Sequence, residues 1–230
     1  MMRPASKYGV VTFLDVLGWK GVYDRHPDAI DSLARLIEGV HARATEKQRG
    51  RILGEVLVKS ISDTIAMFTF CSDTEILTTI EVHGELCQWL IPESIEAEIP
   101  VRGATAYGEF EIRDNIFVGK AVDEAAAWHE QADWIGVHLP PPAEYVFSPQ
   151  NPSAAWLHYN PPNKNRLAWT SHCVNWTAGW LNRDQKVAQI KAKFRRLGPI
   201  VPDIAAKFAN TLSFIAAMSA PNLITQQRRG

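Results

Sequence analysis

Two aspartates occupy positions from which their carboxylates could bind metal ions. Asp15 ends a β-branched and aromatic run, Tyr8 to Asp15, which is typical of a buried strand. Asp63 lies in the short link Ser60 to Asp63 between two further strand-like runs, which predicts a hairpin. If these strands are neighbours, both carboxylates converge at one edge of the sheet. Adjacent carboxylates repel each other unless a cation lies between them, and oxygen ligands suit Mg²⁺ or Mn²⁺.

Such a pair of ions could act on a polyphosphate. Two metal ions would lower the pKa of an attacking hydroxyl and neutralise charge on a leaving pyrophosphate. The segment Leu17 to Gly21 would add backbone N–H groups at a helix start, which suits phosphates. Either aspartate alone is more often a cap or turn residue. The hypothesis therefore depends on their joint occurrence with a third segment, Val101 to Gly108, and the later Gly119 to Ala125.

The elements that must position these residues follow from hydrophobic periodicity and turn residues. After the first strand, the predicted order is a helix over Asp31 to Lys47, strands Glu55 to Lys59 and Thr64 to Phe70, a helix Thr74 to Leu90 ended by Pro92, strands Val101 to Tyr107 and Glu109 to Ile112 with a bend at Gly108, a helix Gly119 to Gln131, and a short strand Trp134 to His138. This order, βαββαβ with additions, predicts an α+β fold of the ferredoxin-like type with additional strands. Helices are expected on one face of a mixed sheet.

The composition changes after about residue 139, where prolines become frequent. We expect residues 1–139 to form the catalytic-type domain. Residues 140–230 are expected to form a loop-rich, helical C-terminal extension packed on the same domain. It should contain one or two short strands, such as Arg166 to Thr170, helices near Asp184 to Arg196 and Asp203 to Met218, and a frayed tail, Gln226 to Gly230. Its tryptophans, from Trp156 to Trp180, are expected to be core residues.

The composition excludes several classes of protein. Of the 230 residues, 46% are hydrophobic and 21% charged, which is typical of a soluble globular chain. A formal net charge of −1 argues against a nucleic-acid partner, because there is no global basic field. Apolar runs are shorter than the roughly 20 residues of a membrane span, and the N-terminus is interpreted as a strand and not as a signal peptide. We therefore expect a cytoplasmic protein without direct membrane contact.

The cysteines and histidines give no sign of a metal site. Cys71, Cys87 and Cys173 are widely spaced and are expected to be buried thiols in a reducing compartment. Three histidines lack metal-ligand spacing and are interpreted as ordinary: His129, His138 and His158.

The ordered segments resemble the class III adenylate and guanylate cyclases over roughly residues 8 to 138. Phe13 to Trp19 is similar to their F-x-D-x-x-G-[FW] segment, and Lys59 to Asp63 to K-[TS]-[IL]-G-D. The V-R-x-x-x-x-x-G strand from Val101 and the G-x-x-V-x-x-A helix from Gly119 also match. The resemblance implies two Mg²⁺ or Mn²⁺ ions per active site, held by Asp15, Asp63 and Val16. It also implies a head-to-tail homodimer with composite active sites.

The resemblance suggests further roles, several with a plain alternative. Arg102 would contact phosphate or the transition state, or form a salt bridge at the dimer interface. Leu17, Gly18 and Trp19 would bind phosphates. Lys59 would touch base or phosphate, or be a surface lysine. Tyr107 would stack on the base or pack in the core, and Asp123 would order its helix or contact ribose.

Departures from the family pattern point to the substrate. Ser62 replaces the usual turn glycine, and the second base-reading position, near Ile116, has no carboxylate. The transition-state Asn and Arg fall at Asp123 and Ala127. Either the chain is an inactive cyclase-homology dimerisation module, or it belongs to a branch that uses another base. The second pattern resembles the pyrimidine cyclases of the bacterial Pycsar antiphage system. That likeness implies conversion of UTP, or CTP, to the 3′,5′-cyclic nucleotide and activation of a separate effector. An adenylate or guanylate cyclase is the remaining alternative.

Overall fold

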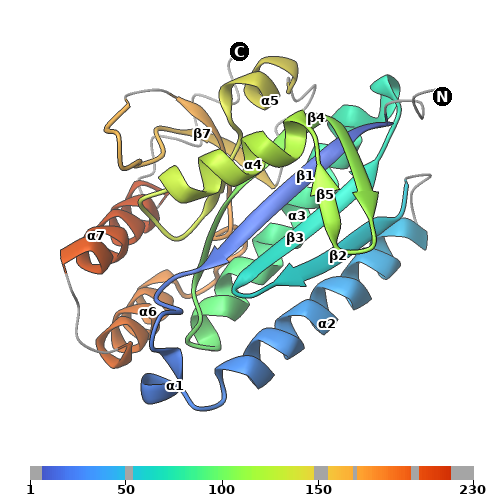
Figure 1. Ribbon diagram of the computed structural model, residues 1–230. Helices are drawn as coiled ribbons and strands as arrows, with labels where there is room; N and C mark the ends of the chain where they lie inside the picture. Colours follow the sequence, from blue (N-terminus) through green and yellow to red (C-terminus); the bar gives the residue numbers. More distant parts are fainter. Residues whose placement is uncertain (1–6, 50–53, 148–154, 168–169, 198–201, 219–230) are drawn as a thin grey trace.

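A computed structural model describes residues 7–49, 54–147, 155–167, 170–197 and 202–218 (Figure 1). The strands are β1 (Lys7–Val16), β2 (Val56–Ile61), β3 (Thr64–Phe70), β4 (Val101–Arg113), β5 (Ile116–Val118), β6 (Val137–His138), β7 (Trp156–Tyr159) and β8 (Ser171–Val174). They form a mixed sheet in the order β2-β3-β1-β4-β6-β8-β7, and β5 pairs with β4. The β4–β6 pair is parallel and the other pairs are antiparallel.

The helices lie on both faces of this sheet. They are α1 (Val22–Arg25), α2 (Ala29–Arg49), α3 (Ile76–Glu96), which follows a 3-10 turn at Asp73–Glu75, α4 (Lys120–Gln131), α5 (Pro141–Val146), α6 (Arg183–Arg196) and α7 (Pro202–Ala217). Helices α2 and α3 pack on one face, whereas α4 crosses β1 and β4 on the other (Figure 1). The α+β class is confirmed, but the expectation of helices on a single face was wrong because α4 buries Ala121, Val122 and Ala125 against the opposite side.

Strand β1 separates the two apolar layers. Val10 and Leu14 point into the larger core with α2 and α3, and Val11 and Phe13 into the smaller core under α4. Because side chains alternate along a strand, Asp15 shares the side of Phe13. We call this side the α4 face and the other side the α2–α3 face.

Most predicted elements of the first part of the chain are confirmed, with corrections to one helix and two strands, of which the strand predicted at Trp134 to His138 is only Val137–His138. Helix α3 does not stop before Pro92 but continues to Glu96. A proline inside a helix costs about 3 kcal/mol. Here Ile91 and Ile95, both buried in the core, favour continuation. The Ser94 hydroxyl donates to the Ile91 carbonyl and accepts from the Val101 N–H, which fixes the link to β4.

Strand β4 is one strand and not two. Gly108 does not bend it out of the sheet, since it stays in the ladder opposite Gly9. The unpredicted strand β5 returns along the end of β4 after a two-residue turn in which Asp114 has a φ of 52°. Asp and Asn tolerate this left-handed conformation.

The C-terminal part adds strands to the same sheet. Strand β8 pairs with both β6 and β7. Helix α5 and the position of β7 were not predicted, whereas α6 and α7 confirm the two expected helices. The proline run Pro140 to Pro142 opens helix α5 instead of forming a loop, because proline is tolerated in a first helical turn. The strand predicted at Arg166 to Thr170 was wrong: the described residues of that range lie outside a strand, and β8 begins at Ser171. The tail Gln226 to Gly230 and positions 168–169 lie outside the described residues.

Aromatic residues of the C-terminal part fill the core as expected. Trp156 and Trp176 are fully buried, and the Trp156 indole N–H donates to the Ile80 carbonyl, 3.0 Å away. Cys87 and Cys173 are buried and free, and burial raises the pKa of both thiols. Cys71 was also expected to be buried but is only half-buried. In the described part of the chain, no helix has both the length and the apolar composition to cross a lipid bilayer.

The buried His83 makes stability depend on pH. Its ring nitrogens lie 2.8 Å from the Thr12 hydroxyl and 3.0 Å from the Thr69 hydroxyl, and burial lowers its pKa to about 3. The unfolded chain, with an ordinary histidine pKa, binds a proton that the folded chain does not. The free energy of unfolding is therefore unaffected by this group above about pH 6.5. Between that pH and about pH 3 it falls by about 1.4 kcal/mol for each pH unit as the pH is lowered. Urea unfolding between pH 4.5 and 6.5 should show a shallower dependence in His83→Gln than in the exposed control His41→Gln. Equal slopes would contradict the assignment.

Candidate active site

The backbone brings Asp15 and Asp63 to the same end of the sheet. Asp15 is the penultimate residue of β1 and pairs with Thr64 of β3, the residue after Asp63. The Val16 N–H donates to the Asp63 carbonyl at 3.0 Å, which fastens the β2–β3 turn to the end of β1. Ser62, in the turn, has a φ of 55°, the left-handed region where glycine fits best. The expected hairpin and the strand adjacency are thus confirmed.

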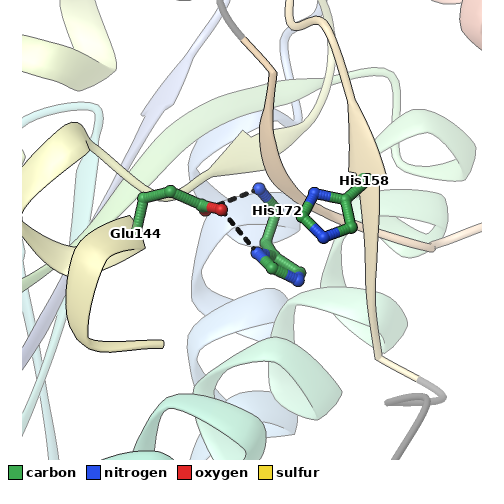
Figure 2. Close-up of side chains that lie close together, drawn as sticks. All are labelled: Glu144, His158 and His172. Atoms are coloured by element: carbon green, nitrogen blue, oxygen red, sulfur yellow. Dashed lines mark hydrogen bonds and ion pairs between the residues drawn. The ribbon is translucent and has the colours of Figure 1, made fainter. Parts of the chain in front are cut away.

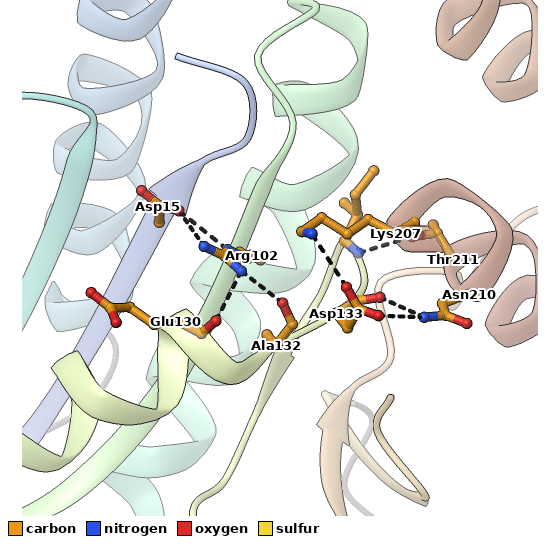
Figure 3. A network of polar contacts seen from close by, with 9 residues as sticks. Asp15, Arg102, Glu130, Ala132, Asp133, Lys207, Asn210 and Thr211 are labelled. Carbon is orange, nitrogen blue, oxygen red and sulfur yellow. Dashed lines mark hydrogen bonds and ion pairs between the residues drawn. The ribbon is translucent and has the colours of Figure 1, made fainter. Parts of the chain in front are cut away.

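Arg102 forms an ion pair with Asp15 inside one chain. It lies directly opposite Asp15 on β4, and its Nε and Nη2 donate to Asp15 Oδ2 at 3.1 and 3.0 Å. Its Nη1 donates to the carbonyls of Glu130 and Ala132, at 3.0 and 2.9 Å (Figure 3). The side chain is about nine-tenths buried, so this guanidinium is fully committed to fixed acceptors.

This arrangement leaves Asp15 suited to a hard cation. Both contacts of Arg102 fall on Oδ2, and the other oxygen, Oδ1, has no hydrogen-bond partner among the described residues. The Asp15 side chain is 19% exposed and Asp63 is half-buried, so both can be reached from solvent. Carboxylate oxygens of this kind fit Mg²⁺ or Mn²⁺. Arg102 would hold the carboxylate in place while Oδ1 binds the ion.

Helix α7 supports the carbonyls that hold Arg102. Asp133, which follows Ala132, is 3.2 Å from the Lys207 ammonium and accepts from the Asn210 amide, at its carbonyl (2.7 Å) and at Oδ2 (3.3 Å) (Figure 3). Two residues on, the Ile135 N–H donates to the Thr211 hydroxyl at 2.8 Å. The α4–β6 link is thereby fixed on both sides, by Arg102 and by α7.

Removing the Lys207 charge should loosen this link. In Lys207→Met we expect unfolding to become easier by about 2 kcal/mol, because the Lys207 side chain is only 8% exposed and Asp133 loses its counter-ion. The matched control is Arg196→Met, whose pair with Glu98 is 58% and 30% exposed and should contribute under about 1 kcal/mol. Urea denaturation of both variants measures the difference. Equal losses would show that the buried pair does not stabilise α7 on the sheet.

The loop Leu17 to Gly21 has the backbone of a tight turn. Gly18 and Gly21 have φ values of 77° and 71°, and the Arg25 guanidinium donates to the carbonyls of Gly18 and Lys20. The Leu17 N–H donates to the Pro100 carbonyl, so it is not open to a phosphate. The amides from residue 18 to 21 have no partner among the described residues. The helix after the loop is a single turn, so any phosphate would be held by these N–H groups more than by a helix dipole.

The other predicted substrate residues are dispersed. Lys59 pairs with Ala66, which lies on the α4 face, so it shares the side of Asp15. Asp123 is exposed in the first turn of α4. Tyr107 lies on the α2–α3 face, five residues along β4 from Arg102, and packs against the larger core. The structure therefore does not bring Tyr107 to Asp15, and core packing is the observed role. Leu17 and Trp19 also pack partly against this core.

A cavity of about 210 Å³ opens on the α4 face beside the aspartates. It is lined by Phe13, Ile61, Thr64, Ala66, Phe117 and His129. The His129 ring packs edge-on against Phe13, with centroids 6.1 Å apart, and its Nδ1 is 3.2 Å from the Ala125 carbonyl. Sequence reasoning treated His129 as ordinary. Its spacing of four residues from Ala125, and of eight from Ala121, could have placed it on the buried side of the helix.

Comparisons with known proteins identify the fold. No family model matches the chain, and no curated protein does. Among solved structures, an adenylate cyclase of Trypanosoma brucei in its monomeric state matches with a TM-score of 0.50 at 14% identity, covering 77% of this chain and 94% of that one. The catalytic core of a rhodopsin-guanylyl cyclase with converted specificity, in complex with ATPαS, matches with 0.51 at 17%, covering 74% and 95%. The chain therefore has the fold of class III cyclase catalytic domains.

Proposed function

We propose that this protein is a nucleotide cyclase that converts a nucleoside triphosphate to the 3′,5′-cyclic nucleotide and pyrophosphate. In this reaction the ribose 3′-oxygen bonds to the α-phosphorus, the bond from that phosphorus to the pyrophosphate oxygen breaks, and the 3′-hydroxyl proton leaves to solvent. The observation that carries the proposal is the placement of Asp15 and Asp63 at one end of a cyclase-type sheet, joined by the Val16–Asp63 hydrogen bond.

Each residue of the candidate site has a proposed role in binding metal ions or substrate. Asp15 and Asp63, with the Val16 backbone, would hold two Mg²⁺ or Mn²⁺ ions, which supply charge neutralisation and activation of the attacking hydroxyl. Arg102 orients the Asp15 carboxylate through Oδ2. The amides of Gly18 and Trp19 lie in a glycine-shaped turn that can approach phosphate oxygens closely. Lys59, on the face of Asp15, is the cation available for base or phosphate.

The proposed substrate is a pyrimidine nucleotide, with UTP favoured over CTP. One departure of the sequence supports a substrate other than a purine: the second base-reading position, near Ile116, has no carboxylate, although Lys59 is retained. Ile116 lies on β5 and is 67% exposed, so this strand presents an apolar side chain where a purine-reading acid is expected. By likeness to the Pycsar cyclases, the product would be a second messenger in antiphage defence, made in the cytoplasm and read by a separate effector.

A homodimer through the α4 face would complete the site. Ile61 lines the cavity and is half exposed, and Ile116 and Val118, which flank the cavity residue Phe117 on β5 and point to the other side of that strand, are more than half exposed. The β4–β5 hairpin folds over this face, with Phe117 4.9 Å from Phe68 between ring centroids. Apolar residues left open around a cavity are typical of a surface that a partner covers. A second copy of the chain, placed head to tail, would cover both cavities.

The test is turnover of purified protein with Mn²⁺ and each of ATP, GTP, CTP and UTP, with products separated by chromatography and mass. We expect one cyclic pyrimidine. A cyclic purine would support a cyclase but overturn the base assignment. Absence of any product from folded, dimeric protein that binds Mn²⁺ and nucleotide would overturn the enzyme in favour of a binding or dimerisation module.

A further inference from the structure

A second group of metal-ligand side chains lies outside the candidate active site. Glu144 of α5, His158 of β7 and His172 of β8 each present a ligand atom, and these atoms lie within 4.8 Å of one another (Figure 2). His158 was interpreted as ordinary because its spacing suggests no partner. The strand register contradicts this, since His158 pairs directly with His172.

The fold holds the three residues tightly. The imidazole centroids of His158 and His172 are 3.9 Å apart, as expected for directly opposite residues of an antiparallel pair. Glu144 Oε1 is 2.8 Å from His172 Nδ1, and Oε2 accepts from the His172 N–H at 2.8 Å and from the Ser171 hydroxyl at 3.2 Å. Helix α5 is thereby fixed against the β7–β8 hairpin with its carboxylate beside both rings.

The exposure of the cluster is uneven. The His172 side chain is 4% exposed and Glu144 18%, whereas His158 is exposed. The three side chains offer two imidazole nitrogens and a carboxylate oxygen close enough together to face one cation. Because His158 is exposed, an ion can reach the cluster from solvent.

We propose that Glu144, His158 and His172 bind one divalent transition-metal ion of the Zn²⁺ class. Two imidazoles and a carboxylate with an open fourth position are an established zinc ligand set. Asp15 and Asp63 offer only oxygen and suit Mg²⁺ or Mn²⁺, so the two sites differ in chemistry. The ion joins α5 to the β7–β8 hairpin and does not depend on the proposed cyclase activity.

Metal titration of the full-length protein tests this site. Protein freed of metal with EDTA is dialysed into excess Mg²⁺, to occupy any oxygen-only site, and titrated with Co²⁺. We expect one Co²⁺ per chain, visible ligand-field absorption of a four-coordinate ion, displacement by one equivalent of Zn²⁺, and a higher midpoint of thermal unfolding. Failure to bind one equivalent overturns the proposal.

Matched variants separate a metal site from a hydrogen-bonded pair. His158→Gln should weaken Zn²⁺ binding by about 100-fold or more while the Glu144–His172 bond remains. The control His41→Gln, on the exposed side of α2, should bind as the wild type does, and so should Asp63→Asn. Unchanged Zn²⁺ affinity in folded His158→Gln overturns the proposal and leaves Glu144–His172 as a structural pair.

Discussion

Replacing Asp63 with asparagine is expected to lower cyclase turnover by about 1,000-fold, with little change in folding stability. The substitution keeps the size of the side chain and the backbone hydrogen bond from Val16, so the β2–β3 turn should persist. It removes one of the two charges available to hold metal ions. Several kcal/mol of transition-state stabilisation depend on such ions, and about 4 kcal/mol corresponds to a factor of 1,000.

The chain offers a matched control for this variant. Asp114 lies in the β4–β5 turn, is exposed, and has a φ of 52°, close to the backbone of the β2–β3 turn. Asp114→Asn should therefore retain turnover within about twofold, because this exposed carboxylate is not one of the proposed metal ligands. Turnover with the preferred nucleotide and Mn²⁺, with far-ultraviolet circular dichroism as the folding check, measures both. If the two variants lose activity equally, Asp63 has no special role.

Replacing Arg102 with methionine is expected to cost about 3 kcal/mol of stability and to lower metal affinity. The guanidinium is about nine-tenths buried and satisfies Asp15 as well as the carbonyls of Glu130 and Ala132. Its removal leaves a half-buried carboxylate and two acceptors without their donor, the situation in which a buried ion pair is most costly to break. Arg102→Lys should recover only part of the loss, because one ammonium cannot span the three acceptors.

The dependence of turnover on Mn²⁺ concentration shows whether Arg102 orients Asp15 for metal binding or only stabilises the fold. If Arg102 orients Asp15, the Mn²⁺ concentration for half-maximal turnover should rise roughly 10- to 100-fold in Arg102→Met, as for other residues that orient metal ligands. The control is Arg113→Met, whose pair with Glu111 is 72% and 46% exposed and should contribute less than about 1 kcal/mol. Urea unfolding and Mn²⁺ titration supply the two readouts. Lower stability with unchanged Mn²⁺ dependence would leave Arg102 a structural residue only.

Local sequence determined the end of the sheet that carries the candidate active site. The β-branched and aromatic run that forms β1, and the short link between β2 and β3, fix Asp15 at a strand end and Asp63 at a hairpin turn, because both features involve neighbours in the chain. The sequence also allowed a prediction of the sheet face on which Tyr107 lies. Tyr107 is five residues from Arg102, and two residues an odd number apart on one strand lie on opposite faces. The predicted strand Val101 to Tyr107 already contained both residues.

Contacts between distant segments were decided only by the tertiary structure. Arg102 could be placed on a core strand from sequence, but its partner depends on the β1–β4 register, and its carbonyl acceptors on where α4 ends. The cluster of Glu144, His158 and His172 arises because β7 pairs with β8 in one register, and a shift by one residue would turn the histidines to opposite faces. Registers follow from packing summed over the whole sheet, so no single stretch of sequence specifies them.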